Sequence, residues 1–316
     1  MYFYLLRHTS ANGNVYHYVF QLRTEPVSNL LYKIVLGTAQ FGMNYGIANK
    51  SGRVVQKEVS SILNFAWDNG IRYLDTAEGY GASELAIGAH LETHPNQNWE
   101  IITKAGATRD SVANQISCSA KKLGIQPAVF LAHDADSFLN SDFQEGLAKA
   151  RDRGMISKLG VSLYRQDEVE RVMVAKVLPE IIQLPMNILD TRLYRNGILT
   201  DLNNLGIEIH VRSIFLQGLF YLTELELKEN FSEVIPYLDT LRSISESANV
   251  SVAELSLLWL KSLEQVSKIV VGIDNLSQLH GHLATLQKSV GTAYFDEALS
   301  LHFNNEQILN PSLWRK

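Results

Sequence analysis

Short apolar runs alternate along the chain with longer stretches in which apolar residues recur every three or four positions. An apolar run of four or five residues bounded by polar or turn-forming residues is typical of a strand that is buried on both faces. Eight runs fit this description: residues 33–36, 71–75, 101–104, 129–133, 158–162, 180–184, 208–212 and 268–272. The pattern therefore predicts a succession of strand and helix units.

The stretches between these runs have the period of amphipathic helices. The clearest stripe begins after residue 56 and consists of Val59, Ile62, Leu63, Ala66 and Trp67. Asn69-Gly70 then marks its end. Further helices are expected from about Ser83, from Asp110 as the N-cap residue to Leu123, and from Phe138 to Arg153.

Repeated strand and helix units with near-continuous apolar strands indicate a parallel sheet, and eight of them favour closure into a (β/α)8 barrel. The competing fold is an open, doubly wound sheet, which usually carries Gly-x-Gly-x-x-Gly after its first strand when it binds a dinucleotide. Residues 37–42 read Gly-Thr-Ala-Gln-Phe-Gly and do not match. We therefore predict an α/β fold with a single (β/α)8 TIM barrel domain over residues 1–316.

A β-hairpin is expected in front of the barrel, within residues 1–25. Two aromatic-rich runs, Tyr2 to Arg7 and Val15 to Leu22, flank a polar loop that contains Asn12-Gly13. Asn-Gly between two such runs is a strong turn signal. The fold prediction is thus a barrel with an N-terminal hairpin extension.

Composition narrows the class of protein. The chain of 316 residues is 46% hydrophobic and 19% charged, and its net charge of -5 argues against a nucleic-acid or anionic membrane surface. No apolar run reaches the roughly 18 residues that a membrane span needs. The single cysteine, Cys118, cannot form an intrachain disulfide, which is compatible with a cytoplasmic location.

A metal site is not expected. His90 and His94 stand four residues apart, a spacing that can bind zinc on a helix. They lack the Glu that follows the first His of the hydrolytic motif, and the chain has no paired cysteines to assist them. A solvated helix end is the favoured interpretation of this pair.

Ionisable residues lie where three successive strands end. The apolar runs close on Asp75, Lys104 and His133, and Tyr80 lies in the loop after the first of them. Packing alone gives a buried strand no reason to end in such residues, whereas (β/α)8 barrels build active sites at the carboxyl ends of their strands. Each residue taken singly also has a structural explanation, such as a loop cap or a satisfied core histidine, but all four together favour a catalytic site.

These four side chains can deliver a proton to a carbonyl oxygen. A free tyrosine has a pKa of about 10 and is a poor acid at neutral pH. A lysine ammonium about 4 Å away would lower that pKa and make Tyr80 a competent general acid. Asp75 would then hold Lys104 charged and oriented, and His133 would donate to, or shape the pocket for, a substrate oxygen.

At this point the chain resembles a known family, the aldo-keto reductases, and particularly its bacterial members. The resemblance covers roughly residues 33–286, and its main motif is Leu-Asp-Thr-Ala-Glu-Gly-Tyr-Gly at 74–81, followed by Ser83-Glu84. The family's catalytic tetrad is Asp, Tyr, Lys and His in this order and in these elements. The resemblance therefore implies an NAD(P)H-dependent (β/α)8 enzyme with Asp75, Tyr80, Lys104 and His133 as its tetrad.

The resemblance also implies a set of cofactor-binding residues. They are Gly37, Thr38, Ser162, Gln183, Arg212, Ser213, Gly218, Leu219, Gly272, Asp274, Gln278 and His282. Ser162 and Gln183 correspond to the residues that contact the nicotinamide carboxamide, and Arg212 to a position that often holds a stacked Tyr. A planar guanidinium can also stack on a ring.

Several positions depart from the family pattern. Leu163 replaces an Asn, and His282 replaces an Asn that contacts the adenine. Asp274 stands about where many members place the Arg or Lys that clamps the 2′-phosphate of NADP. An acid would repel that phosphate but could accept a hydrogen bond from the 2′-hydroxyl of NAD. The choice between NADP(H) and NAD(H) is therefore left open, since another base could provide the clamp.

The substrate is expected to be a small molecule with an aldehyde or ketone group. Met43, Tyr45 and Phe215 would form an apolar wall of its pocket, while Arg212 could meet an anion. The opening at 36–49 resembles bacterial members of carbohydrate pathways, which suggests a sugar or sugar-derivative carbonyl; the alternative is a generic aldehyde reductase. A second hypothesis is a catalytically weak, nucleotide-binding regulatory protein on the same fold. The oligomeric state is left open between monomer and homo-oligomer.

Overall fold

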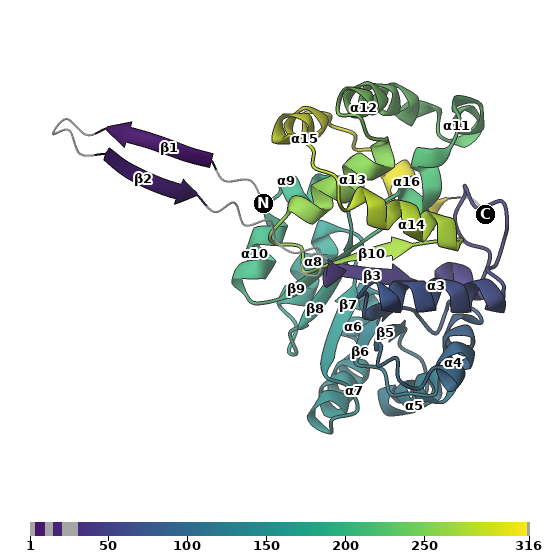
Figure 1. Ribbon diagram of the computed structural model, residues 1–316. Helices are drawn as coiled ribbons and strands as arrows, with labels where there is room; N and C mark the ends of the chain where they lie inside the picture. Colours follow the sequence, from purple (N-terminus) through teal and green to yellow (C-terminus); the bar gives the residue numbers. More distant parts are fainter. Residues whose placement is uncertain (1–3, 10–14, 21–30, 315–316) are drawn as a thin grey trace.

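Eight parallel strands close into a barrel in the order β10-β3-β4-β5-β6-β7-β8-β9 (Figure 1). The structure is a computed structural model that describes residues 4–9, 15–20 and 31–314. The barrel strands are β3 Ile34–Gly37, β4 Tyr73–Asp75, β5 Glu100–Ala105, β6 Val129–Ala132, β7 Lys158–Ser162, β8 Ile181–Pro185, β9 Glu208–Arg212 and β10 Lys268–Gly272. The predicted (β/α)8 barrel is confirmed.

Helices surround the barrel in the ribbon of Figure 1. The longer ones are α3 Gln56–Asp68, α4 Ser83–Thr93, α5 Val112–Leu123, α7 Ser141–Asp152, α8 Gln166–Met173, α12 Ile235–Ser247, α13 Val252–Ser262, α14 Leu276–Thr285 and α15 Thr292–Leu299. Short ones are α2 Ala39–Gly42, α6 Ala135–Leu139, α9 Arg192–Arg195, α10 Ile198–Asn204, η1 Leu216–Tyr221, α11 Glu224–Asn230, η2 Ser232–Val234, α16 Glu306–Leu309 and η3 Pro311–Leu313.

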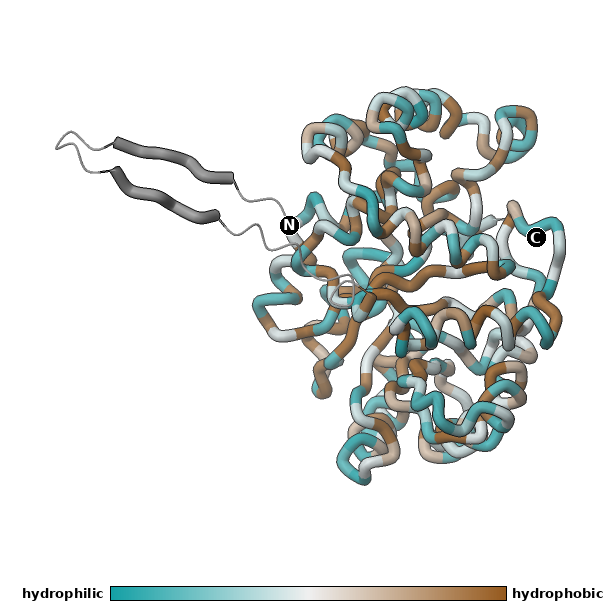
Figure 2. Tube along the Cα trace, viewed as in Figure 1, coloured by the Kyte–Doolittle hydropathy of each residue, from teal (hydrophilic) through white to brown (hydrophobic). Residues whose placement is uncertain are grey.

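Alternate residues of the strands pack in two different layers, as the period of a strand requires. Val35 and Ile102 belong to a small apolar cluster, whereas their neighbours Ile34 and Ile101 belong to the large core. Brown, hydrophobic segments follow β3 and β10 in Figure 2, while brown and teal segments alternate along the outer helices. This double burial explains why the strands read as continuous apolar runs in the sequence.

Strand register brings the predicted site residues to one end of the barrel. Gly37 of β3 pairs with Asp75 of β4, and Lys104 of β5 pairs with Leu131 of β6. His133 follows β6 directly, and its backbone amide donates to the Ala105 carbonyl at 3.0 Å. The carboxyl ends of β4, β5 and β6 therefore present Asp75, Lys104 and His133 side by side.

Two predicted helix boundaries are wrong. The helix expected to start at Asp110 has Ser111 as its N-cap residue, since the Ser111 hydroxyl accepts from the Asn114 amide at 3.3 Å. The helix expected over residues 138–153 is two helices, α6 and α7. Asn140 separates them in an extended conformation, and its side chain caps α7 at the Phe143 amide.

Strands β1 Tyr4–Thr9 and β2 Val15–Phe20 form an antiparallel pair. This confirms the predicted N-terminal hairpin, although its turn at Asn12-Gly13 lies outside the described residues. The segment 21–30 that leads to the barrel is likewise outside them. Among the helices of the described ranges, none is long and apolar enough to cross a membrane.

Candidate active site

A buried ion pair lies at the carboxyl ends of the adjacent strands β4 and β5. The Lys104 Nζ is 2.7 Å from Asp75 Oδ1, and both side chains are almost fully buried. Lys104 also donates to the Thr76 carbonyl at 2.9 Å, while the Gln183 amide donates to Asp75 Oδ2 at 2.7 Å. Both carboxylate oxygens of Asp75 therefore have a donor, which holds the ion pair in one orientation.

Tyr80 lies beside this pair in the loop between β4 and α4. The Lys104 Nζ is 5.2 Å from the centroid of the Tyr80 ring, and the imidazole of His133 meets that ring edge-on at a centroid distance of 6.0 Å. The close approach of α2 depends on Gly42, because a Cβ there would lie 1.7 Å from the Tyr80 carbonyl oxygen. The structure thus brings Asp75, Tyr80, Lys104 and His133 into one cluster.

The protonation state of Tyr80 differs from the prediction. Burial raises the pKa of Tyr80, the Asp75 carboxylate raises it further, and Arg212 opposes them only in part. Because Lys104 is paired with Asp75, its charge is largely cancelled at short range. The prediction that Lys104 brings the pKa of Tyr80 toward neutrality is therefore wrong for this structure, and Tyr80 keeps its proton at pH 7.

His133 is neutral at pH 7. Burial, followed by the positive charges of Lys104 and Arg212, lowers its pKa to about 4. A neutral imidazole carries one N–H donor and one acceptor nitrogen. His133 can therefore donate a hydrogen bond to an oxygen near Tyr80 without adding a positive charge to the site.

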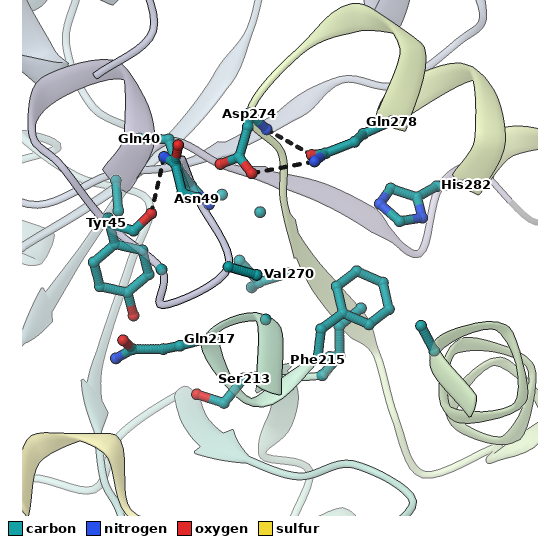
Figure 3. Close-up of a pocket in the computed structure, with 18 of the residues that line it drawn as sticks. Gln40, Tyr45, Asn49, Ser213, Phe215, Gln217, Val270, Asp274, Gln278 and His282 are labelled. Carbon is teal, nitrogen blue, oxygen red and sulfur yellow. Dashed lines mark hydrogen bonds between the residues drawn. The ribbon is translucent and has the colours of Figure 1, made fainter. Parts of the chain in front are cut away.

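A cavity of about 490 Å³ lies at the mouth of the barrel, and its lining includes Asp75 and Tyr80 of this cluster but not Lys104 or His133. Asp75 and Tyr80 line one part of it, and Glu254, Asp274 and His282 line another. Figure 3 shows Tyr45, Gln217 and Phe215 around the cavity, with Asp274 and Gln278 joined by two hydrogen bonds. A cavity of this size is within the range of cofactor sites, about 300–1,000 Å³.

Most of the residues predicted to bind cofactor or substrate line this cavity. They are Gly37, Thr38, Tyr45, Arg212, Ser213, Phe215, Gly218, Gly272, Asp274, Gln278 and His282. Gly37 and Gly272 keep it open at the ends of β3 and β10, since a Cβ at Gly272 would lie 3.0 Å from the Gln40 amide nitrogen. The cavity therefore gathers residues from strands far apart in the sequence.

Other predicted residues do not line it. Ser162 and Gln183 are buried, and Leu219 is fully buried in the core. Met43 is half-buried, and a Cβ built at Gly81 would lie 3.7 Å from its side chain. The cavity-lining residues of the described chain therefore do not include Ser162, Gln183, Leu219 or Met43.

Several lining residues were not predicted. They are Gln40, Asn49, Gln217, Tyr221, Ser251, Glu254 and Thr285. Asn49 fixes the loop after α2, because its amide donates to the Tyr45 and Gly52 carbonyls. A polar residue in a loop that follows a barrel strand is the one sequence signal that could have found Gln40 and Asn49.

Arg212 is held in place from several sides. Its Nε donates to the Ser162 hydroxyl at 3.2 Å, and one of its terminal nitrogens donates to the Leu163 carbonyl at 3.1 Å. The guanidinium lies over the Tyr164 ring, 4.0 Å from its centroid. A flat cation is thereby presented at the cavity wall close to Tyr80.

The segment after β9 has an unusual backbone. Ser213, Leu216 and Gln217 have positive φ angles of 58°, 47° and 51°, a region that residues other than glycine seldom adopt. The loop opposite supports this conformation, since the Ile47 amide donates to the Gln217 carbonyl at 2.9 Å. Strain of this kind clusters at ligand-binding sites, and here it borders the cavity.

The His90 and His94 pair contributes to packing. Their rings stack at a centroid distance of 4.1 Å, and the Nε2 of His90 lies 2.9 Å from the Gln97 side-chain oxygen. His90 is fully buried, so the predicted solvated helix end is wrong for this residue. Within the described part of the chain, no group of three or more His, Cys, Asp or Glu residues is placed to hold a metal ion.

The residues present fit a nicotinamide dinucleotide. The cavity has two chemically distinct parts, one lined by the proton donor Tyr80 and one lined by aromatic rings. Phe215 and His282 stack there at a centroid distance of 4.9 Å, and Phe215 also meets Tyr221 edge-on at 5.8 Å. Asp274 also lines the cavity, and Gln278 and Gln40 interact favourably with its carboxylate.

Barrel and site together define a (β/α)8 protein with a buried Lys104–Asp75 pair beside a cavity lined by Tyr80. A sequence model of the aldo/keto reductase family matches residues 33–297. The chain belongs to this family, and it is accordingly an NAD(P)H-dependent oxidoreductase.

Similar proteins agree with this assignment. D-threo-aldose 1-dehydrogenase of a Pseudomonas species is 26% identical, with 52% of this chain and 69% of that protein covered. L-glyceraldehyde 3-phosphate reductase of Escherichia coli O157:H7 is 25% identical over 77% of this chain and 83% of that protein. The holo form of an aldo-keto reductase from Bacillus halodurans has the same fold, with a TM-score of 0.69, 18% identity, and coverage of 94% of this chain and 96% of that chain.

Proposed function

We propose that this chain reduces an aldehyde or ketone to the alcohol, with Tyr80 as the general acid. The observation that carries the proposal is the buried cluster in which protonated Tyr80 lines the cavity beside the Lys104–Asp75 ion pair. When bound, NAD(P)H supplies the hydride that the carbonyl carbon receives. Tyr80 supplies the proton, so the alcohol product has gained the hydride at its carbon and the proton at its oxygen.

The roles of the four residues follow from their contacts. Tyr80 gives its phenolic proton to the carbonyl oxygen, and the positive charge of Arg212, which opposes the rise in the pKa of Tyr80, favours the resulting tyrosinate. Asp75 keeps Lys104 charged and oriented, since burial otherwise lowers the pKa of that lysine. His133, neutral at pH 7, donates a hydrogen bond to the substrate oxygen.

The chemistry of the two parts of the cavity supports it as the binding site of the cofactor. Arg212, held against Ser162 and Tyr164, would position the nicotinamide near Tyr80. The aromatic end at Phe215 and His282 would hold the adenosine. The cavity wall between these two ends would be formed by Ser213, Gly218, Gly272 and Gln278.

We propose a hydroxylated aldehyde, such as a sugar, as the substrate class. The cavity offers hydrogen-bonding groups as well as rings, because Tyr45, Asn49 and Gln217 line it together. Two similar proteins are named for an aldose and for glyceraldehyde 3-phosphate. Tyr45 supplies part of the apolar wall expected from the sequence, whereas Phe215 lies at the aromatic end that we assign to the adenosine.

The substitution Tyr80→Phe tests the assignment of the acid. It removes the phenolic proton with little change in volume, so we expect turnover to fall by roughly 10²- to 10⁴-fold while cofactor binding is kept. Tyr194→Phe is the control, because Tyr194 packs against Trp259 outside the cavity lining. Near wild-type turnover in Tyr80→Phe would contradict the proposal.

A second candidate is a nucleotide-binding regulatory protein. Three features of the cofactor site favour it, namely Leu163, Arg212 and Asp274, which replace the residues usual in the family. Such a protein would bind the nucleotide and show no turnover with any carbonyl compound. The single barrel domain over 1–316 and a cytoplasmic location stay predictions, the latter supported by the single cysteine.

A further inference from the structure

Three hydroxyl side chains form a buried cluster next to the loop that carries Tyr80. Thr38 follows β3, Thr76 follows β4, and Ser83 is the first residue of α4; all three are fully buried. The Thr76 hydroxyl donates to Ser83 Oγ at 3.0 Å, and Ser83 Oγ in turn lies 2.8 Å from both the carbonyl and the hydroxyl oxygen of Thr38. A satisfied network of buried hydroxyls is rigid, so this hydroxyl cluster fixes the three elements to one another.

The hydroxyl cluster reaches the buried ion pair through backbone groups. The Thr38 hydroxyl donates to the Asp75 carbonyl at 2.9 Å, and the Thr38 amide donates to the same oxygen at 3.0 Å. The Thr76 carbonyl accepts from Lys104 Nζ at 2.9 Å. Thr76 therefore contacts Lys104 with its carbonyl and Ser83 with its hydroxyl, which ties the start of α4 to the position of the lysine.

Ser83 also closes the loop that carries the proton donor. The Ser83 amide donates to the Tyr80 carbonyl at 3.1 Å. The ring of Tyr80 meets Lys104 and His133 at distances of 5.2 and 6.0 Å from its centroid. These ring contacts are not directed at the hydroxyl, so the place of the phenolic oxygen depends on the backbone that Ser83 holds.

We propose that Ser83 is a positioning residue for the proton donor. Its hydroxyl fixes the first turn of α4 to Thr76, and its amide extends that restraint to Tyr80. Tyr80 is thereby held in one place beside the Lys104–Asp75 pair, as proton transfer to a substrate oxygen requires. Ser83 is not among the described residues that line the cavity, so cofactor binding does not depend on it. The inference rests on the proposed function.

A double-mutant cycle of Ser83→Ala and Tyr80→Phe in the full chain tests it, with kcat measured on a panel of aldoses and simple aldehydes. Ser83→Ala releases Tyr80, so kcat should fall by roughly tenfold to a hundredfold. The Kd of NADH and of NADPH, measured by fluorescence, should stay within about threefold. In the Tyr80→Phe background, Ser83→Ala should change the residual kcat by less than about twofold, because no phenolic proton remains to be positioned.

Two further variants complete the design. Thr76→Val removes the same hydrogen bond from the other side, so its loss of kcat should also depend on Tyr80. This variant carries the test if Ser83→Ala does not fold. Ser267→Ala is the matched control, because the Ser267 hydroxyl accepts from the Ile209 amide at 3.3 Å at the opposite end of the barrel, and kcat should stay unchanged.

The outcomes separate this inference from the proposed function. A loss of kcat that is as large in the Tyr80→Phe background as in the wild type, or no loss in either, would overturn the role of Ser83 and leave the carbonyl reductase intact. Near wild-type turnover in Tyr80→Phe alone would overturn the proposed acid, and this inference with it.

Discussion

At the scale of single residues, a hydrogen-bonded chain joins Arg212 at the cavity wall to the buried ion pair beside Tyr80. Arg212 donates to Ser162, whose hydroxyl is 3.5 Å from the Gln183 oxygen. Gln183 in turn donates to Asp75, the partner of Lys104. The sequence predicted these residues because each stands at or near the end of a strand. It could not predict the raised pKa of Tyr80, which depends on burial and on the short distance between Lys104 and Asp75.

Gln183→Met tests whether this amide supports Asp75. The change removes a hydrogen bond to a charged group, worth about 1.5–3 kcal/mol, so kcat should fall by roughly tenfold or more. The Kd of the cofactor, measured by fluorescence, should stay within about threefold. A rise in Kd with kcat unchanged would instead show that Gln183 serves only the nicotinamide.

At the scale of elements, helix packing is set by positions that sequence periodicity cannot identify. The apolar stripe of α3 was predicted because amphipathic periodicity needs no tertiary information. The break between α6 and α7 was not, since Asn140 acts as a cap only when the backbone turns there. Close contacts between helices are also invisible in the pattern: a Cβ at Gly88 of α4 would lie 2.1 Å from the Lys122 carbonyl of α5.

Replacing each of two helical glycines by alanine should therefore have opposite effects on stability. Gly88→Ala should lower the free energy of unfolding by about 1–3 kcal/mol, because backbone atoms must move apart. Gly281→Ala in α14 meets nothing within 4 Å, and alanine should raise that free energy by about 0.5–1 kcal/mol. Urea unfolding of both variants provides the measurement. Equal effects would contradict the close packing of α4 on α5.

At the scale of the whole molecule, folding buries histidines whose sequence context does not mark them as buried. Burial lowers the pKa of His133 and of His282 from the ordinary 6.5 to about 4, and it lowers the pKa of His90 and His210 as well. The barrel itself was predictable from eight apolar runs, but the burial of loop and helix histidines depends on how the units close. These side chains therefore bind protons more readily in the unfolded chain.

Stability should consequently depend on pH in a definite direction. The contribution of these histidines is complete above pH 6.5 and is lost as pH falls toward 4, where the folded protein also takes up the protons. The free energy of unfolding in urea should thus decrease between about pH 6.5 and pH 5, before the carboxylates titrate. His282→Asn should make that decrease shallower. A constant free energy over this interval would contradict the burial of the histidines.

The measurement that tests the account most directly is the oxidation of NADH and of NADPH by the wild-type protein with a panel of aldoses and simple aldehydes. Binding of each nucleotide is measured in parallel by fluorescence. We predict carbonyl-dependent loss of the reduced nicotinamide absorbance, with the alcohol formed in equal amount. Stoichiometric nucleotide binding without turnover on any member of the panel would contradict it and favour the regulatory protein.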